Sequence, residues 1–112
     1  MSLTSKLKAF GEAIGELDIT VYHYFHTRPE DVIHYMVWAE DEEADSLDAD
    51  NIKQEQGIHG TVDLYSLVEY DEMIDTIQEF LNEYENLSFR LNSTQYEDET
   101  KLIHTEWEFW LR

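Results

Sequence analysis

Residues 35–68 constrain the fold more than any other part of the chain. They form an apolar run at 35–39, an acidic segment at 40–56 and an alternating run at 61–68. The acidic segment contains eight Asp or Glu residues and neither Gly nor Pro. A connection of that length is uncommon inside a small domain and usually has a function. The pattern predicts a long β-hairpin with a projecting acidic arm that makes contacts, rather than a catalytic pocket.

The composition predicts one folded domain over residues 1–112. Hydrophobic residues make up 42% of the chain and aromatic residues 13%, which is enough for a core. The formal net charge of −19 disfavours binding to DNA, RNA or anionic lipid, because those partners need Lys and Arg. There is no cysteine, so disulfides and thiolate metal sites are excluded. We expect no membrane span and no signal peptide, and a cytoplasmic protein is the default expectation.

The spacing of apolar residues predicts the element order α-β-β-β-α-β-β. One amphipathic helix is expected over residues 2–16, and a second begins after Asp71, a candidate N-cap. Residues 92–100 read as a polar connection. We therefore expect an α+β domain with helices packed on one face of an antiparallel sheet. Alternating patterns predict strands over residues 18–25, 32–39, 61–68, 87–92 and 103–111.

The titratable residues form no recognisable catalytic or metal motif. The five histidines fit no HExxH-type spacing, which favours ordinary sheet-surface positions. Asp41, Glu43 and Asp45 alternate as in an EF-hand calcium loop. However, the sixth loop position, which requires Gly, is occupied by Ser46, and the twelfth, which requires Glu, is occupied by Ile52. Nothing marks a carboxylate pair as desolvated, and no cofactor fingerprint is present. We expect no enzyme activity, no cofactor and no metal.

Two tryptophans close to the end of the chain carry a signal for an interface. Trp107 and Trp110 are three residues apart in a predicted strand, so they point to opposite faces. We therefore expect one of them to lie outside the main core. An exposed aromatic residue on a sheet face is typical of a protein–protein contact.

A pattern of many positions, rather than one motif, extends over residues 18–112. It consists of YMVWAED, DSLDADN, QEQGIHGTVDLY, IQEFL, RLNSTQYEDET and IHTEW, at residues 35–41, 45–51, 54–65, 77–81, 90–100 and 103–107. In these residues the chain resembles a group of small prophage proteins of Gram-positive bacteria, the tail-completion or tail-terminator-like proteins of long-tailed phages. One departure is that the turn after Trp38, which often contains glycine in that family, is here an acidic run that favours a more extended arm.

The resemblance implies an α+β fold that assembles as a ring, commonly hexameric, at the head-proximal end of the tail tube. Such rings stop tube polymerisation and offer a docking surface to the head connector, and the family has no active site. The implied partners are copies of this chain, the tail tube protein and the head connector protein. The implied location is the host bacterial cytoplasm during assembly and then the virion tail.

The acidic segment is the predicted assembly arm. Because carboxylates repel phosphates, we expect these residues to face either the lumen through which DNA passes or the tube protein. An alternative is a soluble inhibitor that mimics DNA, which needs carboxylates spaced like phosphates on an outer face. A small enzyme with a carboxylate pair is the least supported alternative and needs a concave pocket. The predicted arm residues are Glu40, Asp41, Glu42, Glu43, Asp45, Asp48 and Asp50.

Overall fold

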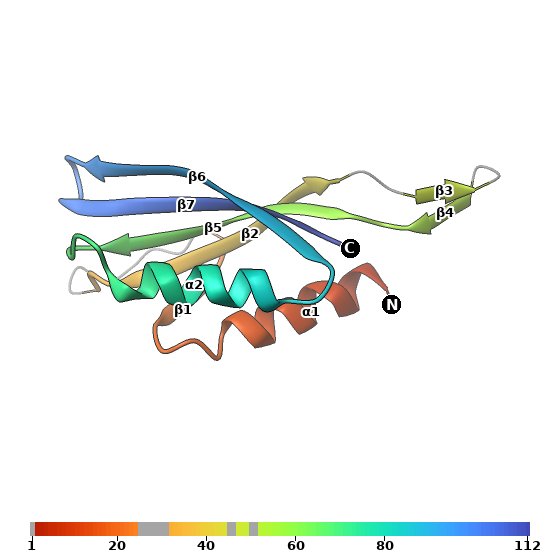
Figure 1. Cartoon of the computed structure of the whole chain (residues 1–112), viewed down its shortest axis with the longest axis horizontal. Coiled ribbons are helices and arrows are strands. Elements are labelled where there is room, and N and C mark those ends of the chain that lie inside the picture. The colour runs from red at the N-terminus through yellow and green to blue at the C-terminus, as the bar shows by residue number, and fades with distance from the viewer. Residues whose placement is uncertain (1, 25–31, 45–46, 50–51) are drawn as a thin grey trace.

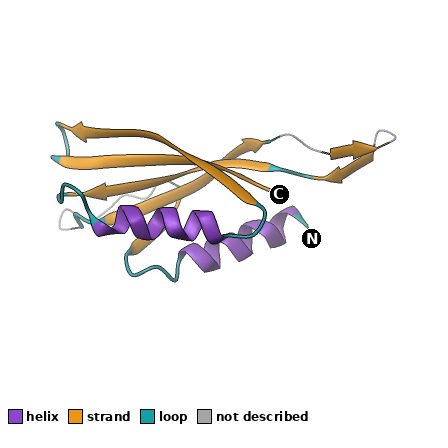
Figure 2. Cartoon of the chain, viewed as in Figure 1, coloured by secondary structure: helices purple, strands orange, loops and turns teal. Residues whose placement is uncertain are grey.

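Both helices pack on one face of a five-stranded sheet in the computed structural model (Figures 1 and 2), which confirms the predicted α+β class. The structure describes residues 2–24, 32–44, 47–49 and 52–112, with side-chain surroundings described outside residues 45–55. The order of helices and main-sheet strands is the predicted one. The elements are α1 (Leu3–Ile14), β1 (Thr20–His23), β2 (Tyr35–Glu43), β3 (Leu47–Ala49), β4 (Ile52–Glu55), β5 (Ile58–Ser66), α2 (Glu72–Glu83), β6 (Leu87–Glu97) and β7 (Leu102–Leu111).

The sheet is mixed rather than fully antiparallel. Its strand order is β1-β2-β5-β7-β6, and all its pairs are antiparallel except β1 with β2, which run parallel. The expectation of an antiparallel sheet is therefore wrong for this one edge. Alternation of apolar and polar residues assigns faces to a strand, but it carries no information on the direction of the neighbouring strand.

β2 and β6 extend beyond the predicted ends of their strands. The prediction ended the second strand at residue 39, whereas β2 reaches Glu43, and residues 92–97 belong to β6 rather than to a polar connection. Each strand has a register shift, between Glu40 and Glu42 in β2 and between Leu91 and Ser93 in β6. A bulge interrupts the two-residue period, so the alternating sequence pattern stops at a point where the strand itself continues.

The core lies between the helices and the covered face of the sheet. Phe10 of α1 stands at its centre, with ring centroids 4.9 Å from Phe109, 5.1 Å from Trp38 and 5.2 Å from Tyr84. Trp107 is fully buried in this core. Trp110, on the other face of β7, is only partly buried, so the prediction that one tryptophan lies outside the core is confirmed.

The molecule is elongated, with principal extents of 51 × 23 × 23 Å. β2 and β5 lead to the two-stranded β3–β4 hairpin, which projects from one end of the body (Figure 1). Neither described helix is long and apolar enough to cross a membrane. The helix-free face of the main sheet, called here the open face, is left without a covering layer of described secondary structure.

Candidate functional site

The hairpin that leaves the body begins at a closed base. The Ala44 backbone N–H donates to the Gly57 carbonyl oxygen at 3.0 Å, just after the last residue pair of β2 and β5, Glu43 and Ile58. Beyond this base, β3 and β4 pair antiparallel with each other. The backbone thus forms a projecting hairpin where the acidic segment predicted one, while the arm's acidic surface and its contacts stay predictions.

The predicted arm residues separate into two groups. Glu40, Asp41, Glu42 and Glu43 belong to β2 and lie at the body, not on the projecting hairpin. Asp48 is in β3, with its side chain undescribed, and Asp45 and Asp50 lie outside the described residues.

Glu40 points to the helix-covered side, at the exposed end of β1. It pairs with Nε2 of His23 at 2.7 Å and accepts a hydrogen bond from the Tyr24 hydroxyl. Burial alone raises the pKa of Glu40, but the hydrogen bonds from Tyr24 and His23 outweigh it, so this pKa lies below its ordinary value. The His23 ring also stacks on Trp38 with centroids 3.9 Å apart, which fixes the end of this edge strand.

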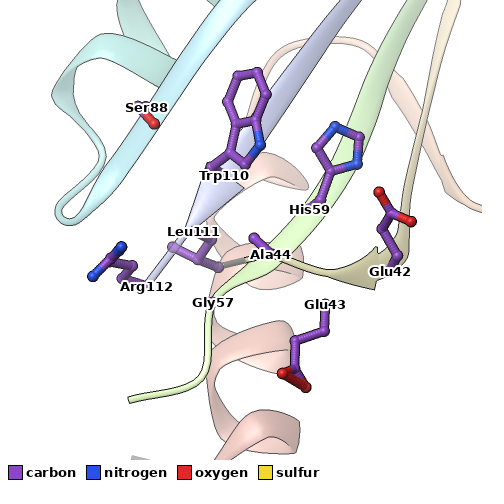
Figure 3. Close-up of a pocket in the computed structure, with 9 residues that line it drawn as sticks. All are labelled: Glu42, Glu43, Ala44, Gly57, His59, Ser88, Trp110, Leu111 and Arg112. Carbon is purple, nitrogen blue, oxygen red and sulfur yellow. The ribbon is translucent and has the colours of Figure 1, made fainter. Parts of the chain in front are cut away.

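A polar hollow of about 380 Å³ lies at the base of the projecting hairpin. Figure 3 shows His59 and Trp110 projecting side by side from β5 and β7, with Glu42 of β2 near His59 and Glu43 directed to the opposite side. The rings of His59 and Trp110 are 5.3 Å apart at an angle of 63°. The hollow is therefore lined by the aromatic rings of His59 and Trp110 and by the carboxylates of Glu42 and Glu43 at the base of the arm.

His59 is held between carboxylates of two different strands. Its Nδ1 lies 2.6 Å from Asp41 of β2, and its Nε2 lies 3.4 Å from Glu108 of β7, which also pairs with Arg90 at 3.3 Å. Burial lowers the pKa of His59, but the hydrogen bonds and charges of Asp41 and Glu108 outweigh this and raise it above the ordinary value. The imidazolium form can donate from both nitrogens.

His104 has a similar setting further along the open face. Its Nε2 lies 2.6 Å from Asp63 of β5, and its Nδ1 lies 3.2 Å from Glu97 of β6. The hydrogen bond with Asp63 raises the pKa of His104 against the opposing effect of burial, and the charges of Asp63, Glu97 and Glu106 add to the increase. The ring stacks on Tyr65 with centroids 4.4 Å apart, and Tyr65 stacks in turn on Tyr35.

Two clusters of side chains on the open face have the donor atoms of a metal site. Asp41, Glu42 and His59 form one and Asp63, His104 and Glu106 form the other, with ligand atoms within 4.8 Å of one another in each. In the described part of the chain no histidine is bonded to a Ser or Thr hydroxyl. The two clusters supply the donor atoms for binding a cation or a proton.

The sequence predicted histidines on the sheet surface, which holds for His23, His59 and His104 but not for His34, which precedes β2, and it missed their partners. All four described histidines pair with carboxylates that are at least 17 residues away in the chain. Such pairs depend on strand register, which no local motif contains. The one available signal was the polar alternation of residues 104, 106 and 108, which puts His104 and Glu106 on one face. His26 lies outside the described residues, and the histidines with these partners are His23, His34, His59 and His104.

The comparisons with known proteins add no family to this geometry. No protein-family model matches the chain, and a search of curated proteins finds no match.

Proposed function

We propose that this chain is a non-enzymatic structural protein of a phage or prophage tail, which forms a ring at the head-proximal tail end. The observation that carries the proposal is the hairpin that extends from the neighbouring interior strands β2 and β5 beyond the body. An element that projects from a rigid sheet can reach a neighbouring subunit without disturbing the core. The resemblance in residues 18–112 points to the same assembly.

The sheet edges support assembly between copies of the chain. β1 and β6 are the outer strands of the main sheet, and neither outer edge is paired with another described strand. An unpaired strand edge offers backbone N–H and C=O groups to another chain. A ring closes when such a contact repeats head to tail through a fixed rotation.

The net charge of −19 predicts how the ring responds to salt. Copies of the chain repel one another, and raising ionic strength from about 0.1 M to about 1 M shortens the screening length from about 10 Å to about 3 Å. The first experiment is therefore molar mass by light scattering at low and high salt, with negative-stain images of the same samples. Rings favoured by salt support the proposal.

If the protein stays monomeric at every salt concentration, a ring can form only on a preformed tail tube. Adding purified tail tubes then decides the question, because a tail-end protein binds one end of each tube. Failure to bind tubes contradicts the proposal. Salt-sensitive binding to a DNA-binding enzyme or repressor in place of tubes is the outcome that favours the acidic DNA-mimic alternative.

The base of the arm is tested by charge reversal. Replacing Glu42, Glu43 and Asp45 with Lys is expected to impair DNA passage or tail joining, measured as the titre of a phage that depends on this chain. A matched control replaces three exposed acidic residues at the end of α2 and just beyond it, Glu79, Glu83 and Glu85, with Lys. Normal titres from the arm variant contradict a role of these carboxylates in assembly.

A further inference from the structure

Two carboxylates face each other across the middle of the open face. Asp63 of β5 and Glu106 of β7 are direct partners in the strand register, and both strands are interior to the sheet. Like charges placed directly opposite each other on neighbouring strands destabilise a sheet. Most of the Asp63 side chain is buried, with 14% exposed, so solvent screens its charge only partly.

The positive charge nearby does not balance these carboxylates. His104 lies beside Asp63 and Glu97, and its own imidazolium can offset one negative charge among Asp63, Glu97 and Glu106. No described Lys or Arg forms an ion pair with any of the three; Arg90 pairs with Glu108 instead. A partly buried cluster with surplus negative charge is costly unless a cation joins it.

The His104 ring is oriented as a ligand would be. Its side chain is 12% exposed, the ring lies against Tyr65, and its buried Nδ1 has no hydrogen-bond partner of good geometry. Glu106 is also held, because the Asn92 side chain donates a hydrogen bond to its Oε2. The donor atoms of Asp63, His104 and Glu106 thus converge within 4.8 Å on side chains with restricted movement.

We propose that Asp63, His104 and Glu106 bind a divalent transition-metal ion of the Zn²⁺ class. Imidazole nitrogen and carboxylate oxygen are both ligands of these ions, whereas Ca²⁺ takes oxygen ligands alone. The ion takes the place of the proton between His104 Nε2 and Asp63, which moves those atoms from 2.6 Å to roughly 3 Å apart. Nδ1–H then lies 3.2 Å from a carboxylate oxygen of Glu97, close enough for Glu97 to reach it by a small side-chain rotation.

The bound ion would connect two interior strands at the uncovered side of the sheet. Asp63 comes from β5, and His104 and Glu106 come from β7. Because the unfolded chain does not bring these residues together, metal binding adds to folding stability. The site is independent of ring formation, so its test uses the stability of the single chain.

The first experiment is thermal unfolding of the chelator-treated protein with and without added Zn²⁺, together with calorimetric titration of the same sample. We expect one tight site and a Tm increase of roughly 10 °C when free Zn²⁺ exceeds Kd about 100-fold. Ring-nitrogen NMR of the histidines should show the His104 Nε2 resonance changing on saturation. No Tm shift and no change at His104 would overturn the proposal.

The decisive variant is Glu106→Gln, which keeps the shape of the side chain and an acceptor for Asn92 but removes a ligand charge. We expect at least a tenfold loss of Zn²⁺ affinity, together with unchanged or higher stability in chelator, because the repulsion with Asp63 is gone. Glu108→Gln, two residues further along the same face of β7, is the matched control and should keep the tight site. Equal Zn²⁺ binding by wild type and Glu106→Gln indicates adventitious binding to surface carboxylates and overturns the proposal.

Discussion

Among Gly11, Gly15 and Gly60, the backbone leaves the least room for a side chain at Gly60. A Cβ atom there would lie 2.4 Å from the carbonyl oxygen of Ala39 and 2.6 Å from Cζ of Phe109. Because the first of these is a backbone atom in a paired strand, it cannot move without disturbing the β2–β5 register. The close approach of β2, β5 and the core aromatic cluster therefore depends on glycine at this position.

We predict that Gly60→Ala lowers the free energy of unfolding by about 2–3 kcal/mol through overpacking. The measurement is urea denaturation with an unchanged m-value. Gly15→Ala is the control, since a Cβ at this helix C-cap meets a backbone oxygen at 3.1 Å and should cost far less. If both variants lost the same free energy of unfolding, crowding around a Cβ at position 60 would not be the cause of the loss.

His59 gives a pH dependence with a defined sign. Its pKa is raised in the folded protein above the ordinary value of 6.5. The stability it contributes is therefore fully present below pH 6.5 and is lost as pH rises through the raised pKa. The groups that face the ring are Asp41 and Glu42 of β2 and Glu108 of β7.

In chelator, His59→Gln should make the free energy of unfolding fall less steeply as pH rises above 6.5. Asp41→Asn should act in the same direction, because it removes the nearest carboxylate while keeping the histidine. The measurement is urea denaturation over a series of pH values. If both variants kept the wild-type slope of unfolding free energy against pH, the assignment of this pH dependence to His59 would be contradicted. A smaller slope should remain in both variants, because the pKa of His104 is also raised.

At the scale of helices and strands, the sequence predicted best where alternation is uninterrupted. β7, predicted over residues 103–111, runs from Leu102 to Leu111 and buries every second residue from Thr105 onward. β5 was predicted over residues 61–68 but runs from Ile58 to Ser66. Prediction failed at the bulges in β2 and β6, where one extra residue changes the phase of the pattern. It also failed for the direction of β1, because a parallel pair depends on where the connection returns the chain.

The clusters on the open face could not be predicted for a related reason. His104 and Glu106 are visible as neighbours on one strand, but Asp63 joins them only because β5 and β7 pair in one particular register. A shift of one residue would place Asp63 on the covered face. Residue types and spacing within a strand are therefore insufficient, and the register supplies the missing information.

The start of α2 was predicted correctly and gives a test at the element scale. Asp71 accepts hydrogen bonds from the Met73 backbone N–H at 2.9 Å and from the Ser66 hydroxyl at 2.6 Å, and it pairs with His34 at 2.7 Å. Burial raises the pKa of Asp71, but these hydrogen bonds outweigh it, so the pKa lies below the ordinary 3.8. The cap therefore stabilises the protein above pH 3.8 and loses its effect as pH falls through the lowered pKa.

We predict that Asp71→Ala costs about 1–2 kcal/mol at neutral pH. Asp75→Ala, in the same first helical turn, removes a charge near the helix dipole and should cost only about 0.3–1 kcal/mol. Urea denaturation at neutral pH and below pH 3 measures both, and the Asp71→Ala deficit should shrink in acid. A deficit that does not change with pH would mean that the Asp71 charge is not involved.

At the scale of the whole molecule, a small helix-covered body is separate from a long projection. The described core residues lie in α1, α2 and the main sheet, all within the body. The projection is attached through β2 and β5, whose last hydrogen bond joins Ala44 to Gly57. This layout predicts that folding and assembly can be separated by editing the chain at that base.

The experiment replaces residues 45–56 with a two-residue Asn-Gly turn, which suits a hairpin closed by the Ala44–Gly57 pair. We expect the Tm to change by only a few degrees, since all the described core residues stay in place. The described hydrogen bonds to the body that are lost run from Lys6 Nζ to the Gln56 carbonyl oxygen and from the Gln56 side chain to Glu43. Ring formation or tail-tube binding should be lost, because the projecting hairpin is absent. Light scattering, tube binding and thermal unfolding of the same sample measure both properties.

An unfolded product would mean that the hairpin belongs to the folding unit. A folded product that still forms rings would instead place the contact between subunits at the sheet edges β1 and β6.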